Sequence, residues 1–133
     1  MGYYSDVYFK IEMNTELITP AEVFDDLKDR MKAVDSWYMI NNCILKPNYE
    51  EGYLVVGWES IKWYTGELGF AEINAVEDWF KYFVDMIDDN NDNSVIKGAQ
   101  KIIIGEDYND TVDECYGVLD NYMYINRSVD LNI

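Results

Sequence analysis

The sequence predicts an α+β domain in which a mainly antiparallel sheet carries two helices on one face. Segments of alternating apolar and polar residues indicate strands, and two longer apolar stripes with helical spacing indicate helices. Of the 133 residues, 49% are hydrophobic, which is enough to build a core without disulfide bonds. The length fits a single domain that spans residues 1–133.

The first two elements have clear signals. Apolar side chains alternate with other residues from Val7 to Met13, which predicts a half-buried strand. A capping box follows, in which Thr19 precedes Pro20 and Glu22 stands three residues after Thr19. Apolar residues then recur at helical spacing, so a helix is expected from about Pro20 to Val34.

The middle of the chain predicts two further strands and a second helix. The apolar run from Trp37 to Leu45 is interpreted as a strand that ends at Lys46-Pro47-Asn48. After a Glu51-Gly52 turn, Tyr53 to Trp58 forms the next strand. A continuous apolar stripe from about Ala71 to Asp88 predicts the second helix.

The last third is less regular. Lys101 to Ile104 predicts a short strand, the acidic segment 107–120 supports no assignment, and alternation predicts a strand within Tyr122 to Ile133. The first six elements follow the βαββαβ order of ferredoxin-like folds, to which a C-terminal strand is added.

Composition limits the chemistry. The chain has no histidine, which excludes Ser-His and Cys-His catalysis and histidine-bearing zinc sites. It also lacks phosphate-binding glycine loops. Cys43 and Cys115 are far apart in the sequence and form no CxxC motif; a disulfide between them stays open, but two reduced thiols in a cytosol are favoured. We therefore expect no catalytic residues, no cofactor and no metal.

Charge indicates the kind of partner. The chain holds 26 acidic against 10 basic residues, a formal net charge of −16. Such a surface repels nucleic acids and anionic membranes but attracts basic proteins. The N-terminal segment has no signal-peptide pattern, and no apolar run is long enough to span a membrane, so a cytoplasmic location is expected.

One group of carboxylates lies where the second helix is expected to end. It consists of Asp85, Asp88, Asp89 and Asp92. The alternation of oxygen ligands resembles the start of a calcium loop, but the sixth position is Asn93 and the twelfth is Ala99, so the glycine and the bidentate glutamate are missing. A solvated turn is therefore favoured. Carboxylates at a helix C-terminus are electrostatically unfavourable, and a basic partner would relieve this.

A second group follows the predicted strand at 101–104. It consists of Glu106, Asp107, Asp110, Asp113 and Glu114. These residues could bind magnesium or manganese or form a two-carboxylate hydrolase site, although no accompanying motif supports either. An exposed acidic loop is favoured. Carboxylates spaced along loops and helix ends can also imitate a row of phosphates, which would attract a protein built to grip nucleic acid.

The aromatic segment at 58–64 has two interpretations. Trp58, Trp63 and Tyr64 belong either to the core or to a protein interface, where Trp and Tyr concentrate. The surrounding acidic charge argues against direct nucleic-acid binding.

Three motifs carry a family resemblance that spans most of the chain. They are the Gly2-Tyr3-Tyr4-Ser5-Asp6-Val7 start, the Lys62-Trp63-Tyr64 segment, and the stretch from Ile104 to Asp110. Together they resemble a group of small acidic proteins encoded by bacteriophages and prophages. An arginine is expected in that group where this chain has Tyr4. The resemblance implies a phage accessory protein acting in a bacterial cytosol, and such proteins often inhibit host defence.

The main hypothesis is therefore a non-enzymatic protein that binds and inhibits a host nucleic-acid-binding defence complex, such as a CRISPR effector or a restriction enzyme. Residues 77–114 hold 11 acidic side chains against three lysines, and the two carboxylate groups above are the predicted binding residues. Three alternatives stay open: an immunity protein that neutralises a nuclease toxin, a metal-dependent protein using Asp107, Asp110 and Asp113, and a protein that self-associates through its aromatic residues.

Overall fold

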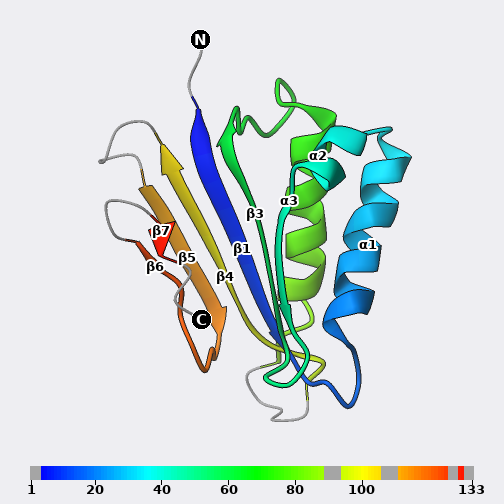
Figure 1. Ribbon diagram of the computed structural model, residues 1–133, viewed down its shortest axis with the longest axis vertical. Helices are drawn as coiled ribbons and strands as arrows, with labels where there is room; N and C mark the ends of the chain where they lie inside the picture. The colour runs from blue at the N-terminus through cyan, green and yellow to red at the C-terminus, as the bar shows by residue number, and fades with distance from the viewer. Residues whose placement is uncertain (1–3, 89–93, 106–110, 126–128, 131–133) are drawn as a thin grey trace.

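The chain forms an α+β fold with a five-stranded antiparallel sheet and three helices, in a computed structural model that describes residues 4–88, 94–105, 111–125 and 129–130. The strands lie in the order β2-β3-β1-β4-β5. Their bounds are β1 (Ser5–Met13), β2 (Ile44–Asn48), β3 (Tyr53–Ile61), β4 (Ile96–Gly105) and β5 (Thr111–Gly117). The helices are α1 (Pro20–Ala33), α2 (Trp37–Asn41) and α3 (Ala71–Val84), and they lie on one side of the sheet (Figure 1). The predicted α+β class and the mainly antiparallel sheet are thus confirmed.

Strand β1 occupies the centre of the sheet and is buried on both faces. It pairs antiparallel with β3 on one side and with β4 on the other. Val7, Phe9 and Ile11 face the helices, whereas Tyr8 and Lys10 point to the opposite face. Both sets are buried, so the prediction of a half-buried strand was wrong. The reason is that residues 119–123, far away in sequence, cover the second face.

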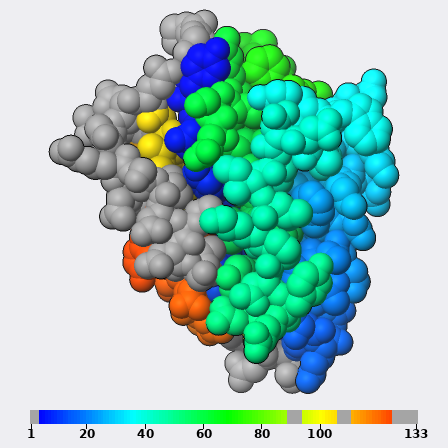
Figure 2. Space-filling model, viewed as in Figure 1, coloured from blue at the N-terminus to red at the C-terminus, as the bar shows by residue number. Residues whose placement is uncertain are grey.

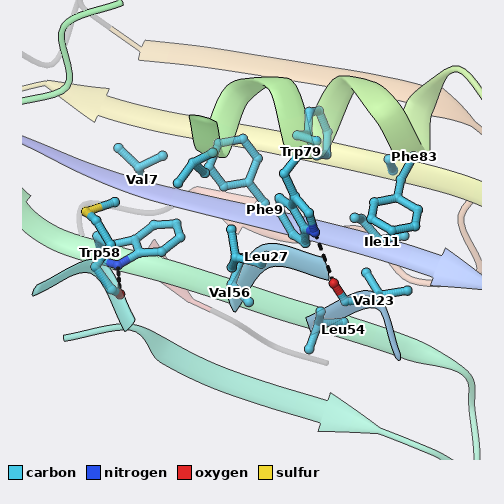
Figure 3. Packing of buried hydrophobic residues seen from close by; sticks show 14 of the residues in the cluster. Val7, Phe9, Ile11, Val23, Leu27, Leu54, Val56, Trp58, Trp79 and Phe83 are labelled. Carbon is cyan, nitrogen blue, oxygen red and sulfur yellow. Dashed lines mark hydrogen bonds between the residues drawn. The ribbon is translucent and has the colours of Figure 1, made fainter. Parts of the chain in front are cut away.

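The main core lies between the helices and the sheet, and indole groups connect its parts. In Figure 3, Trp79 of α3 points across the core, and its indole N–H donates a 3.0 Å hydrogen bond to the carbonyl of Val23 in α1. The indole of Trp58 in β3 donates a 2.7 Å bond to the carbonyl of Met39 in α2. Phe9 contacts both indole rings edge-on. Three helices and the central strand are therefore held by aromatic packing whose polar atoms are satisfied.

The two longer helices begin where the sequence predicted. The Thr19 hydroxyl accepts a hydrogen bond from the backbone N–H of Glu22, which confirms the predicted cap of α1. Helix α3 ends at Val84, four residues before the predicted Asp88. After it the chain turns, and Ile87 forms a bridge with Ile96 of β4.

The prediction of a strand from Trp37 to Leu45 was wrong. Residues Trp37–Asn41 form α2 instead, and β2 starts only at Ile44. Asp35, with a φ of 56°, reverses the chain between α1 and α2, so that Met39 enters the core while Trp37 and Tyr38 stay exposed. A short apolar run does not distinguish a helix from a strand, and Met39 is the one buried residue of α2. Figure 2 shows the α2–β2 segment lying next to α1 on the surface.

The C-terminal region also differs from the prediction. Within Tyr122 to Ile133 the described residues form two short strands, β6 (Tyr124–Ile125) and β7 (Val129–Asp130), which pair with each other and not with the main sheet. Strand β4 starts five residues earlier than predicted, and β5 lies in the acidic segment that supported no assignment. In the described part of the chain, every helix is too short or too polar to cross a bilayer.

Candidate functional site

A cleft of about 340 Å³ lies between α3 and the β4–β5 edge of the sheet. We call it the acidic cleft. Its apolar lining comes from Phe80, Val84 and Tyr116, and its charged lining is provided by Glu77, Asp78, Lys81, Asp85 and Lys101. Helical spacing explains this lining, because residues 77, 81 and 85 follow one another at intervals of four along α3 and its C-cap.

Two carboxylates are fixed by hydrogen bonds and ion pairs: Glu77, which lines the cleft, and Glu114, which contacts its lining residues Lys101 and Tyr116. Glu77 accepts a 2.9 Å hydrogen bond from the indole N–H of Trp63 and lies 3.0 Å from the Lys101 ammonium. Glu114 lies 3.9 Å from the same ammonium and accepts a hydrogen bond from the Tyr116 hydroxyl. Lys101 is thus already neutralised within the protein, and its side chain is only 15% exposed.

Hydrogen bonding changes the acidity of Tyr116. Its bond to Glu114, together with burial and the nearby carboxylates, raises the pKa of Tyr116 to about 12. The phenol therefore stays protonated at neutral pH and keeps the Glu114 carboxylate in place.

The outer carboxylates of the cleft are more exposed. Asp78 and Asp85 are both exposed, and Lys81 lies 4.0 Å from Asp85. Asp85 caps the C-terminal end of α3, where the helix dipole disfavours a negative charge. This unfavourable placement predicts that a cation brought to this end of α3 would be bound favourably.

The structure divides the predicted binding residues. Asp85 and Glu114 belong to the acidic cleft or to its immediate contacts. Asp113 lies on the opposite face of β5, where its carboxylate accepts a 2.9 Å bond from Gln100. Residues 111–114 are therefore not part of an acidic loop, because they start strand β5. Asp88 is exposed beyond the end of α3. The remaining predicted residues, Asp89, Asp92, Glu106, Asp107 and Asp110, lie outside the described residues.

Sequence reasoning missed Glu77, Asp78, Lys101 and Tyr116 as members of the site. The charged stripe at positions 77, 81 and 85 could have indicated the α3 wall. Nothing in the sequence reveals that β5 pairs with β4 and so places Glu114 beside Lys101.

The aromatic segment belongs mainly to the core. Trp58 is fully buried, and Trp63 stacks on it with ring centroids 5.7 Å apart. Tyr64 is half-buried and contacts the Phe70 ring at 6.0 Å. The core interpretation therefore holds for Trp58, while Trp63 connects the core to the acidic cleft through Glu77.

Among the described residues, no three Cys, Asp or Glu side chains are grouped closely enough to hold a metal ion. Cys43 precedes β2 and Cys115 lies in β5, at opposite edges of the sheet. Four strand spacings separate these edges by about 19 Å, too far for a disulfide. Burial raises the pKa of the Cys43 thiol to about 12, so this thiol is a poor nucleophile.

Comparison of the chain with protein-family models, curated proteins and solved structures finds no match.

Proposed function

We propose that the protein is a small acidic binding module that recognises a basic, nucleic-acid-binding partner through the acidic cleft. The observation that carries this proposal is the combination of fixed and exposed carboxylates above an apolar floor. Glu77 and Glu114 are held in place by Trp63, Tyr116 and Lys101, while Asp78 and Asp85 face solvent.

The electrostatics favour such a partner on two length scales. A net charge of −16 attracts basic proteins and accelerates their approach. At contact, preorganised carboxylates lose little side-chain entropy when they meet Lys or Arg. The apolar floor of Phe80, Val84 and Tyr116 offers contact area for the aliphatic stem of such a side chain.

The phage-protein resemblance suggests the biological setting. We propose that the module acts in a bacterial cytoplasm as an inhibitor of a host defence complex, such as a CRISPR effector or a restriction enzyme, by occupying a surface that otherwise binds nucleic acid. An immunity protein against a nuclease toxin would use the same cleft but would have a single cognate partner. The strand order β2-β3-β1-β4, with α1 and α3 in the two connections, supports a ferredoxin-like arrangement for this part of the chain.

A charge-reversal pair tests the proposal. The variant D78K/D85K reverses the charge of two side chains that line the acidic cleft. The control variant E16K/E67K makes the same change in net charge at exposed positions outside the cleft. Each protein is added to purified CRISPR effector and restriction nuclease complexes, with and without competing DNA, at low and high salt.

We expect the unmodified protein to bind at least one complex, to compete with its DNA and to lose affinity as salt rises. D78K/D85K should weaken binding by about tenfold or more, and E16K/E67K by clearly less. Binding that ignores salt, or an equal loss in both variants, would contradict a role for the acidic cleft.

A further inference from the structure

The sheet face opposite the helices carries a buried layer of polar side chains. Lys10 is fully buried, Glu12 is 5% exposed and Gln100 is 1% exposed. Lys10 and Gln100 are direct cross-strand neighbours in β1 and β4, and Glu12 lies opposite Gly98. Burial lowers the pKa of Lys10, and the Glu12 carboxylate 3.3 Å away opposes this shift.

All three side chains bind the backbone of one segment, residues 119–123, which we call the strap. Glu12 accepts bonds of 2.8 and 3.3 Å from the N–H groups of Asp120 and Asn121. Lys10 donates a 2.6 Å bond to the carbonyl of Asn121. Gln100 binds Met123 twice, because its side-chain oxygen accepts from the Met123 N–H at 2.7 Å and its NH₂ donates to the Met123 carbonyl at 3.2 Å.

Two apolar side chains of the strap are buried, and the other three face solvent. Leu119 and Met123 are buried, whereas Asp120, Asn121 and Tyr122 are exposed. The sheet face thus binds five backbone N–H and C=O groups of the strap and buries two apolar side chains that are four residues apart. At Met123 the Gln100 amide binds both backbone polar groups as a neighbouring strand would, whereas the backbone bends at Asp120 and Asn121. Recognition through backbone groups tolerates varied side chains.

The local backbone is shaped for close approach of a second chain segment. A Cβ atom on Gly98 would lie 2.4 Å from the Val118 carbonyl oxygen, so only glycine lets the segment entering the strap lie against β4 at this point. Beside the strap, a cleft of about 290 Å³ stays open between Asp120, Asn121, Glu12, Glu51 and Tyr53. The polar groove therefore extends beyond what the strap fills.

The strap is attached in a way that permits release. In the described part of the chain, it forms no ladder with the five-stranded sheet, and the hairpin after it pairs only with itself. Gly117, with a φ of 66°, and Val118, which is 71% exposed, connect it to β5. Burying a Lys–Glu pair costs solvation, so this closure contributes less stability than an apolar cover would. Within residues 119–123 only Leu119 and Met123 are buried, and a segment held by so few apolar side chains opens locally.

We propose that this sheet face is a peptide-binding groove, occupied in cis by residues 119–123, that takes a segment with two apolar side chains four residues apart, bent between them as the strap is, and recognises it through its backbone. The groove lies on the face away from the helices and is independent of the acidic cleft and of its proposed partner.

The first test uses hydrogen exchange on the unmodified full-length protein. The amides of Asp120, Asn121 and Met123 should exchange through local opening, faster than those of Phe9 and Ile11 in β1. Gln100→Leu should accelerate exchange at Met123 and leave β1 unchanged. Exchange of strap and β1 amides at one common, global rate would overturn the proposal.

The second test supplies the segment in trans. A synthetic peptide with the sequence of residues 118–124 is added to the full-length variant L119D/M123D, whose own strap has lost both apolar anchors. The peptide should bind this variant, bind the unmodified protein at least tenfold more weakly because the groove is filled, and lose about tenfold in affinity when Gln100→Leu is added to the variant. A peptide with Asp at both anchor positions is the matched control and should not bind. Absence of peptide binding to the folded variant would overturn the proposal. If L119D/M123D does not fold, the same peptide titration is made with the single variant M123D, which keeps Leu119, and absence of binding there would overturn the proposal as well.

Discussion

Asp113 and Glu114 are adjacent in the chain, yet their carboxylates lie on opposite faces of the sheet. Asp113 accepts a hydrogen bond from Gln100 beneath the strap, whereas Glu114 binds Tyr116 and approaches Lys101 beside α3. The cause is the two-residue period of strand β5. Two carboxylates that count equally in the net charge therefore serve different surfaces.

This relationship predicts that, of two conservative variants, one changes the pKa of Tyr116 and the other does not. Glu114→Gln should lower the pKa of Tyr116 from about 12 toward its ordinary value of 10.0, because the charged acceptor is lost. Asp113→Asn removes the same charge one residue away and should leave that pKa unchanged. Absorbance titration of the phenolate, with Tyr116→Phe as the reference, measures both. An equal shift in the two variants would contradict the assignment of Glu114 as the partner.

Stability should fall at alkaline pH in part because of Tyr116. The folded state holds its proton up to about pH 12, whereas the unfolded chain releases it near pH 10.0, so the folded state binds more protons between these values. The free energy of unfolding should therefore decrease as pH rises from about 10 to about 12. Denaturation with urea across this range should show a shallower decrease for Tyr116→Phe. A decrease of equal slope in both proteins would exclude a contribution from Tyr116.

Trp79 should be a principal determinant of stability. It is fully buried, contacts Phe9 and Phe83, and connects α3 to α1 through Val23. Trp79→Ala should lower the free energy of unfolding by about 3–5 kcal/mol, since it leaves a large cavity. Trp79→Phe should cost less, about 1–2 kcal/mol. Urea titration monitored by circular dichroism gives both values, and a loss below about 1 kcal/mol for the alanine variant would contradict the packing described.

The two cysteines should differ in reactivity. Cys115 is largely exposed, and the pKa of its thiol is raised by the partial burial that remains and by the nearby Asp113 carboxylate. Cys43 is half-buried, and burial raises the pKa of its thiol to about 12. Alkylation of the folded protein at mildly alkaline pH should therefore modify Cys115 first and Cys43 only on denaturation. Mass spectrometry of the unmodified protein, C43A and C115A separates the two sites. Equal labelling rates would show that Cys43 is accessible.

The parts of the fold that sequence predicted are those where local pattern and tertiary environment agree. The cap at Thr19 and the apolar stripe of α3 are local features, and both helices begin as expected. The segment at Trp37 was misjudged because several of its apolar residues are exposed rather than buried. The spacing of apolar residues indicates a helix or a strand only where those residues face the core.

Fewer residues of the candidate site could be predicted, because the site depends on which strands pair in the sheet. Asp85 and Glu114 were identified from charge alone, but their proximity to one cleft depends on β5 joining the edge of β4. Lys10 and Gln100 gave no signal, since a polar residue on the non-helical face of a strand is ordinarily solvated. The distant strap, at residues 119–123, binds both side chains and helps to bury them.

The central position of β1 has a consequence for biosynthesis. Residues 5–13 are made before every segment that encloses them: β3 follows at 53–61, β4 at 96–105 and the strap at 119–123. A nascent chain therefore carries β1 without its second strand partner until β4, at 96–105, has left the ribosome. Such non-local pairing slows folding and prolongs the exposure of aggregation-prone apolar surface. The many carboxylates of this chain would then also keep unfinished copies apart during synthesis.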